Sequence, residues 1–329
     1  MSSFVFAINA VLPIILLSVV GYFLKRLGWI EKSLVKQLNR LIFRIFLPAM
    51  LFLNVYKIEN ISFNQTGFIF YVVVITLSIF FLGIPLSAIF TKEADRRGVI
   101  LQACFRSNHA LIGLALAQSL GGEKGIQDAA LLSAVIIPLF NVLAVVSLSV
   151  FKKSKKQVSF RSIIADIVKN PLIISVFLGL VAIGIRLVFA RLGISFRLSH
   201  ITPFMKVLEY LSSVATPLAL LVLGAQFEFS AIQSLKKEIV FGTSVRVFFA
   251  PLLALAIAYL FFRNDFTPGN FAVFIAVFST PVAVSSVPMA QEMGGNTDLA
   301  GQLVVWTTLF SAVTIFFSSF ILNLLGVFS

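Results

Sequence analysis

Ten stretches of about 20 predominantly apolar residues follow one another along this chain, and they constrain its fold more than any other feature. An α-helix rises about 1.5 Å per residue, so about 20 such residues cross the ~30 Å hydrocarbon core of a bilayer. Hydrophobic residues occupy 59% of the 329 positions, without the alternation typical of a membrane barrel. We therefore predict an all-α integral membrane protein with ten transmembrane helices. The spans are expected at about residues 5–24, 35–56, 66–90, 98–120, 127–150, 170–190, 204–226, 239–262, 270–292 and 298–325.

The placement of basic residues predicts the orientation of these spans. Most of the 26 lysines and arginines fall in the loops that follow the first, third, fifth and seventh spans. The positive-inside rule assigns these loops to the cytoplasm and both termini to the outside. We expect the first span to be retained rather than cleaved as a signal peptide, because no positive residue precedes it. The net charge of +13 thus reflects loop placement, and no nucleic-acid partner is expected.

The sequence repeats itself in two halves. AQSLGG at 117–122 returns as AQEMGG at 290–295, and the same displacement aligns Ser107 with Thr280 and Asn108 with Pro281. Each half contains five spans, and an odd number requires the second copy to enter the membrane in the opposite orientation, as in many secondary transporters. We predict a first repeat at 1–150, a basic cytoplasmic linker at 151–169 and a second, inverted repeat at 170–329. The cluster Lys152–Lys156 in that linker is expected to lie beside anionic membrane lipid.

Polar residues interrupt the fourth and ninth spans at similar depth. Asn108 lies about 15 Å into the fourth span, near the bilayer midplane, and Pro281 reaches that depth from the other side. Thr280 followed by Pro281 is typical of a helix start, and Ser107 or Asn108 could cap a helix in the same way. We therefore expect helices 4 and 9 to be broken and to cross. The N-terminal ends of their second halves would then attract an anion at the protein centre.

Buried basic residues without acidic partners favour the same interpretation. Arg106 and Arg246 lie inside spans, and no Asp or Glu lies well inside any span. The predicted substrate site comprises Arg106, Ser107, Asn108, His109, Asn141, Arg246, Thr280, Pro281, Ser285 and Ser286. The alternative is structural: small polar side chains join helices in many bundles, and arginines extend toward the membrane surface.

The chain has few residues that could bind a metal or catalyse a reaction, and this limits its function classes. Cys104 is the single cysteine, and His109 and His200 are the two histidines, so no metal site and no cofactor are expected. No nucleophile or acid–base pair is evident, so we do not predict an enzyme. His109 is the evident candidate for a proton relay, and coupling to H⁺ or Na⁺ stays open.

Five motifs resemble the auxin efflux carrier family, which includes the plant PIN carriers and bacterial malate or malonate permeases. The motifs are LPIILLSVVGYFLKRLGWI, RLIFRIFLPAMLFLNV, FRSNHALIGLALAQSLGG, LALLVLGAQF and TPVAVSSVPMAQEMGG. The resemblance implies a scaffold of helices 1, 2, 6 and 7, a transport domain of helices 3–5 and 8–10, a homodimer and elevator-like alternating access. It also matches the family's crossover asparagine to Asn108 and its crossover proline to Pro281.

Two departures distinguish this chain from the PIN carriers. Residues 66–90 contain no acid where the PIN carriers have one, and a short basic linker replaces their long central loop. The second departure suggests a prokaryotic member in the bacterial cytoplasmic (inner) membrane. We predict a secondary transporter of small organic anions, specifically carboxylates. The alternatives are a sodium-coupled symporter of the bile-acid transporter type, a passive channel and a membrane-embedded enzyme.

Overall fold

The computed structural model describes residues 3–58, 66–151 and 160–328, so the cluster Lys152–Lys156 lies outside the described residues. The predicted all-α class is confirmed in this part of the chain, where the single β-type contact is an isolated bridge. In chain order the helices are α1 (Ser3–Arg26), α2 (Lys32–Leu41), α3 (Leu47–Tyr56), α4 (Thr66–Phe90), α5 (Ala94–Phe105), α6 (Leu114–Val150), α7 (Phe160–Val168), α8 (Pro171–Arg191), α9 (Thr202–Gln226), α10 (Ala231–Ser234), α11 (Lys236–Ser244), α12 (Ala250–Phe262), α13 (Pro268–Phe278), α14 (Ser286–Met293) and α15 (Thr297–Leu324).

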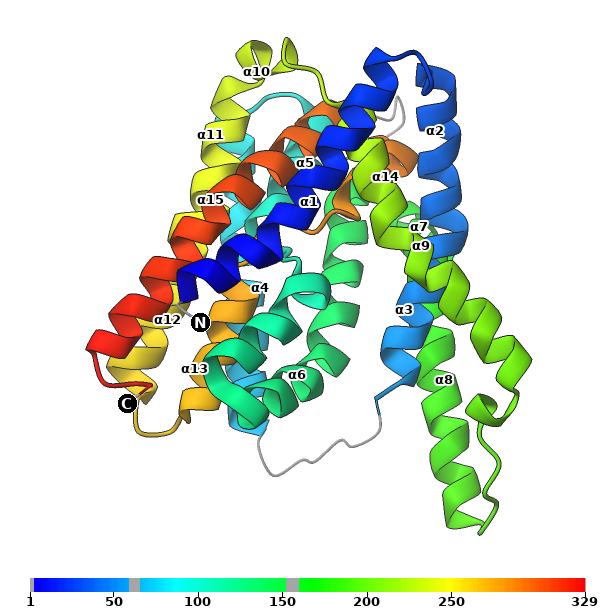
Figure 1. Cartoon of the computed structure of the whole chain (residues 1–329), viewed down its shortest axis with the longest axis vertical. Coiled ribbons are helices and arrows are strands. Elements are labelled where there is room, and N and C mark those ends of the chain that lie inside the picture. Colours follow the sequence, from blue (N-terminus) through cyan, green and yellow to red (C-terminus); the bar gives the residue numbers. More distant parts are fainter. Residues whose placement is uncertain (1–2, 59–65, 152–159, 329) are drawn as a thin grey trace.

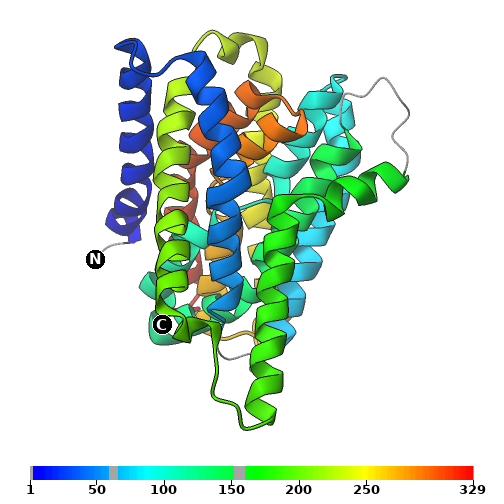
Figure 2. The same cartoon turned by 90° about the vertical axis from the view of Figure 1, so that its right-hand side faces the viewer.

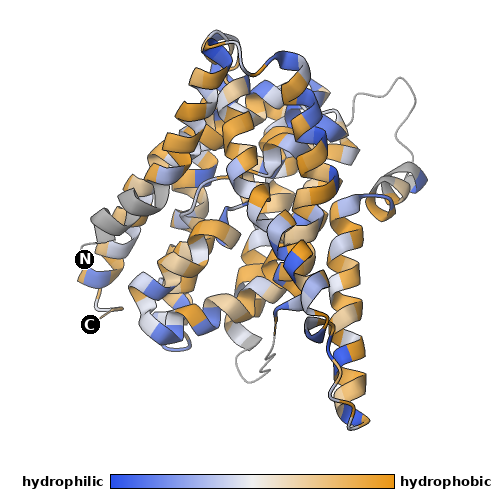
Figure 3. Ribbon diagram, turned by 45° about the vertical axis from the view of Figure 1, so that its right-hand side comes forward, coloured by the Kyte–Doolittle hydropathy of each residue, from blue (hydrophilic) through white to orange (hydrophobic). Residues whose placement is uncertain are grey.

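Several of these helices match the thickness of a membrane. Within the described residues, seven helical runs are long and apolar enough to cross a bilayer. Phe70, Leu260 and Phe261 are 71%, 71% and 72% exposed, and Figure 3 shows apolar residues over most of the helical surface. Soluble monomers rarely expose so much contiguous apolar surface. The chain is a multi-pass membrane protein, as predicted.

The turn between α1 and α2 and the chain termini lie at different levels of the molecule. Figure 1 shows the turn between α1 and α2 at the top together with α10, whereas the start of α1 lies near mid-height and the end of α15 lies lower. Lys25 and Arg26 end α1 at the upper turn.

One group of helices packs through glycine contacts. A Cβ atom at Gly224 of α9 would lie 1.7 Å from the backbone oxygen of Ser18, and one at Gly21 of α1 would lie 1.9 Å from that of Leu221. The two backbones are thus in direct contact, as is common where small residues line membrane helix interfaces. α3 packs against both α8 and α9. Figure 2 shows α1, α9, α2 with α3, and α8 side by side.

A second group of helices contains both interruptions. α13 packs along α6, α4 packs on α5, and α11 packs on α15. α5 ends at Phe105, residues 106–108 leave helical geometry, and a π-helical turn at His109–Gly113 leads into α6. α13 ends at Phe278, and α14 begins only at Ser286. The expectation that the second half-helix starts at Pro281 is therefore wrong, because residues 280–282 are engaged in the contact described below.

The paired glycines of the sequence echo mark where both second half-helices end. Gly122 has φ +59° and turns the chain inside α6, and Gly294 has φ +80° at the C-terminal end of α14. Positive φ is accessible to glycine at little cost, whereas other residues are strained there. The positive-φ glycine is the second of the pair in the first half and the first of the pair in the second half, so each echoed glycine pair ends its half-helix, but at positions one residue apart.

Candidate functional site

The two interrupted segments contact each other at the centre of the molecule. Ser107 and Val282 form an antiparallel bridge, and the Asn108 N–H donates to the Pro281 carbonyl over 2.8 Å. The Val282 N–H donates to the Thr307 hydroxyl of α15 over 3.1 Å. Non-helical backbone at membrane depth requires such internal partners, because no water is present to replace them. Each interruption is therefore satisfied in part by the other.

Arg246 holds the ends of both first half-helices. Its guanidinium donates to the carbonyl oxygens of Thr280, Phe105, Val277 and Phe278 over 2.6–3.1 Å. The final carbonyls of a helix lack intrahelical partners and carry partial negative charge, so a cation is favourable there. Arg246 is 0% exposed, which excludes the interpretation that it extends to the membrane surface. Its four backbone partners account for its charge without a substrate.

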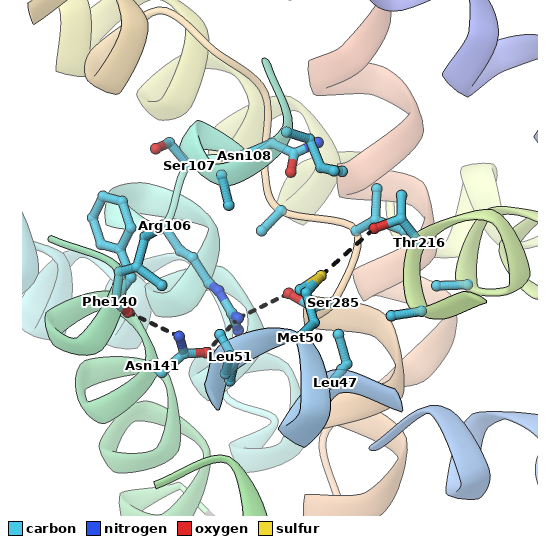
Figure 4. Close-up of a pocket in the computed structure, with 17 residues that line it drawn as sticks. Leu47, Met50, Leu51, Arg106, Ser107, Asn108, Phe140, Asn141, Thr216 and Ser285 are labelled. Carbon is cyan, nitrogen blue, oxygen red and sulfur yellow. Dashed lines mark hydrogen bonds between the residues drawn. The ribbon is translucent and has the colours of Figure 1, made fainter. Parts of the chain in front are cut away.

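A small cavity of about 50 Å³ lies beside the crossing. Figure 4 shows Arg106, Asn141 and Ser285 meeting in it. The opposite wall comes from α3, through Leu47, Met50 and Leu51, and from α9, through Ala215, Thr216 and Ala219. The cavity therefore lies where the glycine-packed helix group meets the group that contains the interruptions.

Arg106 brings a positive charge into this cavity. One terminal nitrogen donates to Asn141 Oδ1 and to Ser285 Oγ, both over 2.9 Å, and the other lies against Met289 Sδ. The residue is 4% exposed. In the described part of the chain, no Asp or Glu forms an ion pair with it. A buried charge with neutral partners alone is costly, and an anion in the cavity would offset that cost.

Two further polar groups at the cavity have unused hydrogen-bonding capacity. Asn108 Nδ2 and Ser107 Oγ are buried and have no partner among the described residues, and both side chains line the cavity. Buried polar groups are nearly always paired, so an unpaired donor beside a cavity indicates a place for a ligand or an ordered water. Asn108 can donate to an oxygen atom that enters from the cavity.

Both second half-helices begin at the cavity. Ala110 and Leu111 line it from the start of the first, and Val284 and Ser285 line it from the start of the second. Leu111 N–H and Val287 N–H are already bound to the Asn108 and Val284 carbonyls, but the N-terminal end of a helix still carries partial positive charge. Two such ends and the Arg106 guanidinium therefore make this region favourable for an anion.

Five of the ten predicted site residues line the cavity, and five do not. Arg106, Ser107, Asn108, Asn141 and Ser285 line it. His109, Thr280, Pro281, Ser286 and Arg246 lie outside its lining. His109 Nε2 lies 3.1 Å from Ser133 Oγ and is completely buried, so it packs against α6.

The predicted capping by side chains is wrong in both halves. The Thr280 hydroxyl donates back to the Ala276 carbonyl in the last turn of α13 over 2.9 Å. Asn108 precedes the second helix half, but its side chain makes no capping hydrogen bond. The residues were correctly placed at the interruptions, but their hydroxyl and amide groups have other roles.

The sequence interpretation missed the wall formed by α3 and α9. These helices carry similar motifs, LPAMLFL around Pro48 and TPLALLV around Pro217, which form a further echo between the two halves. Six of their residues line the cavity across from the crossing: Leu47, Met50, Leu51, Ala215, Thr216 and Ala219. The echo was the available signal, but a repeat does not reveal which face of a helix points inward.

Comparison with known proteins identifies the family of this chain. Residues 6–319 match the membrane transport protein family. An uncharacterized transporter of Methanocaldococcus jannaschii is 30% identical over 236 residues, covering 68% of this chain and 70% of that protein. An uncharacterized transporter of Methanothermobacter thermautotrophicus is 22% identical over 315 residues, covering 93% and 95%. The predicted resemblance to the auxin efflux carriers is thereby confirmed, and the chain belongs to the membrane transport protein family.

Proposed function

We propose that this protein is a secondary transporter of small organic anions, specifically carboxylates, and that it binds them in the cavity at the crossing. The observation that carries this proposal is the buried Arg106 guanidinium, which lines the cavity with neutral partners only. Hydrogen bonds to charged groups contribute about 1.5–3 kcal/mol each. A carboxylate would accept from Arg106 and Asn108 at the positive ends of both half-helices.

The cavity favours an anion with one charged end. Arg106 is the one cation in its lining, and the remaining surface comes mostly from Leu, Met, Ile, Phe, Ala and Val side chains. The cavity of about 50 Å³ has room for a few water molecules, each of which needs about 10–15 Å³ by this measure. Substrate entry therefore requires the two helix groups to separate.

We further propose ten membrane crossings arranged as two inverted five-helix repeats. The seven long runs are supplemented by α1, by α5 with the part of α6 that precedes Gly122, and by α13 with α14, which together give ten. The matching interruptions and the matching glycine ends support the repeat. The basic turns at one end support cytoplasmic loops with outer termini, in the cytoplasmic membrane of a prokaryotic cell.

We also propose alternating access by an elevator-like movement. The scaffold would comprise α1–α3, α8 and α9, and the remaining spans would form the transport domain, with homodimerisation through the scaffold. Support comes from the packing of α1 and α3 on α9 and from the position of the cavity between the two groups. Coupling to H⁺ or Na⁺ would bias the direction of movement.

The test measures carboxylate-driven currents and binding with purified protein in liposomes. We expect saturable signals for a few carboxylates in the wild type and their loss in Asn108→Ala. Asn323→Ala serves as the matched control, because Asn323 is exposed near the end of α15. Unchanged binding in correctly folded Asn108→Ala protein would contradict the proposed site. Signals that never saturate would indicate a channel.

A further inference from the structure

A second cavity opens at the lipid-facing surface and has no role in the proposed transport site. It has a volume of about 300 Å³, the lower end of the range for ligand pockets. Its walls come from α1, the C-terminal end of α9, α10 and α15, and they include Val19, Trp306 and Leu309. Val19 and Leu309 are 42% and 44% exposed, so this groove opens sideways toward the membrane.

The groove ends at a positively charged group. Tyr22 lines it, and the Arg26 guanidinium donates two hydrogen bonds to the Tyr22 hydroxyl over 3.0 and 2.8 Å. The guanidinium carbon lies 5.2 Å from the centre of the Tyr22 ring. This arrangement fixes an exposed arginine at the polar mouth of an otherwise apolar groove. Arg26 retains further N–H donors that can bind an anion.

The surrounding charges keep this mouth positive. Glu228 lies within the electrostatic influence of Arg26, and Lys25 donates to its carboxylate over 2.6 Å. This hydrogen bond, with the nearby charges of Lys25, Lys32 and Arg26, lowers the pKa of the Glu228 carboxyl below its usual value. Lys25 therefore compensates Glu228, and among the other charges of this turn Arg26 and Lys32 outnumber Glu31.

The depth of the mouth matches the position of lipid headgroups. Trp29 lies in the turn just after Arg26 and is 73% exposed. Tryptophans are enriched where the apolar core of a membrane meets its headgroups. An apolar groove that begins at this level and continues inward has the dimensions and polarity of a site for one lipid chain.

We propose that this groove is a binding site for an anionic glycerophospholipid. One acyl chain lies along Val19, Trp306 and Leu309, and the phosphate accepts hydrogen bonds from Arg26. Arginine binds phosphate with paired, charge-assisted hydrogen bonds, and acyl chains gain binding energy with each buried methylene. The proposal does not depend on the identity of the transported substrate.

Trp306 provides a direct probe, because the chain has only two tryptophans. The Trp29→Phe variant leaves Trp306 as the sole indole, and it is reconstituted with lipids that carry bromine on the acyl chain. Bromine quenches tryptophan fluorescence on contact. We expect brominated phosphatidylglycerol to quench Trp306 at a severalfold lower mole fraction than brominated phosphatidylcholine.

Two variants in this background separate a built site from ordinary lipid contact. Arg26→Gln is expected to abolish the preference for phosphatidylglycerol. Val19→Phe is expected to fill the groove and to reduce quenching by both lipids. Arg263→Gln is the matched control, because Arg263 donates to Tyr259 in the same i, i+4 geometry on α12, away from the groove.

Elution as a folded species and an unchanged melting temperature establish that each variant is intact. Equal quenching of Trp306 by both lipids in the Trp29→Phe protein would overturn the proposal and indicate nonspecific lipid contact only. A preference that persists in folded Arg26→Gln protein, or one lost equally in Arg263→Gln protein, would also overturn it.

Discussion

At the scale of single residues, Arg106 and Arg246 are both buried near the crossing, but their surroundings differ. Arg246 donates to four backbone carbonyls that end two half-helices. Arg106 contacts neutral side chains at the edge of a cavity. The first arrangement is complete within the protein, whereas the second has room for an anion.

Substitution of Arg106 should therefore lower carboxylate affinity, whereas substitution of Arg246 should lower stability. Arg106→Gln removes a charged hydrogen-bond donor worth about 1.5–3 kcal/mol, so we expect carboxylate affinity to fall about 10- to 100-fold with little loss of stability. Arg246→Gln leaves buried carbonyls without donors, at about 1–3 kcal/mol each, so we expect a clear drop in melting temperature. Binding titrations and thermal unfolding of both variants check this. The prediction fails if Arg106→Gln is the less stable protein.

The lining of the cavity also predicts which carboxylates are preferred. A second carboxylate would lie among apolar residues such as Leu47, Ile137 and Phe140, where an unpaired charge is strongly unfavourable. We expect monocarboxylates to bind at least about tenfold more tightly than dicarboxylates of similar length, a difference of ~1.4 kcal/mol. Competition binding with matched pairs measures this ratio. Tighter binding of the dicarboxylates would contradict the prediction.

At the scale of helices, the contact between α1 and α9 depends on the absence of a side chain. A Cβ atom at Gly224 would overlap the backbone oxygen of Ser18, whereas Gly184 in α8 has open space around it. We expect Gly224→Ala to destabilise the protein by about 1–3 kcal/mol through overpacking. Gly184→Ala should be neutral or slightly stabilising, because alanine favours helix. Thermal unfolding compares the two, and equal effects would contradict the close contact.

Helix positions were more predictable from the sequence than their internal geometry. The length of the apolar runs located the long spans, and polar residues located both interruptions. Each pattern is compatible with few structures in a membrane. The wrong starting point of α14 has a specific cause: Thr280 and Pro281 are typical of a helix start, but residues 281–282 pair instead with 107–108. Such pairing joins distant segments, and local propensity does not report it.

The lining of the site was predictable only in part for the same reason. Arg106 and Asn108 could be predicted because polar groups inside a membrane span are costly and usually have a function. Met50 and Thr216 were missed because apolar and small residues occur throughout the spans, and only the three-dimensional arrangement shows which ones face the cavity.

At the scale of the whole molecule, the two second half-helices are held differently. Gln291 near the end of α14 accepts from Asn39 over 2.8 Å and donates to the Lys36 carbonyl over 3.2 Å, and Glu292 pairs with Arg44 at 3.7 Å. The corresponding residues of the first half, Gln118 and Ser119, are exposed. The structure is thus closed by polar contacts at the end with the basic turns.

This asymmetry predicts unequal chemical accessibility. Cys104 is buried and is the single cysteine, so Cys104→Ala provides a background without thiols. In that background we expect Gln118→Cys to react quickly with a membrane-impermeant maleimide and Asn39→Cys to react slowly. A transported anion should change both rates in opposite directions. Equal rates that do not respond to substrate would contradict alternating access.

The bridge between Ser107 and Val282 joins segments separated by more than half of the chain. At about 5–20 residues per second, the ribosome adds Val282 roughly 10–35 s after Ser107. Throughout that interval the Asn108 N–H has no Pro281 carbonyl to bind, so the nascent first half carries unpaired backbone at membrane depth. The unpaired backbone of the first half must therefore be kept out of contact with lipid until the second half has been synthesised. A translation product that stops after α6 should be degraded rather than accumulate.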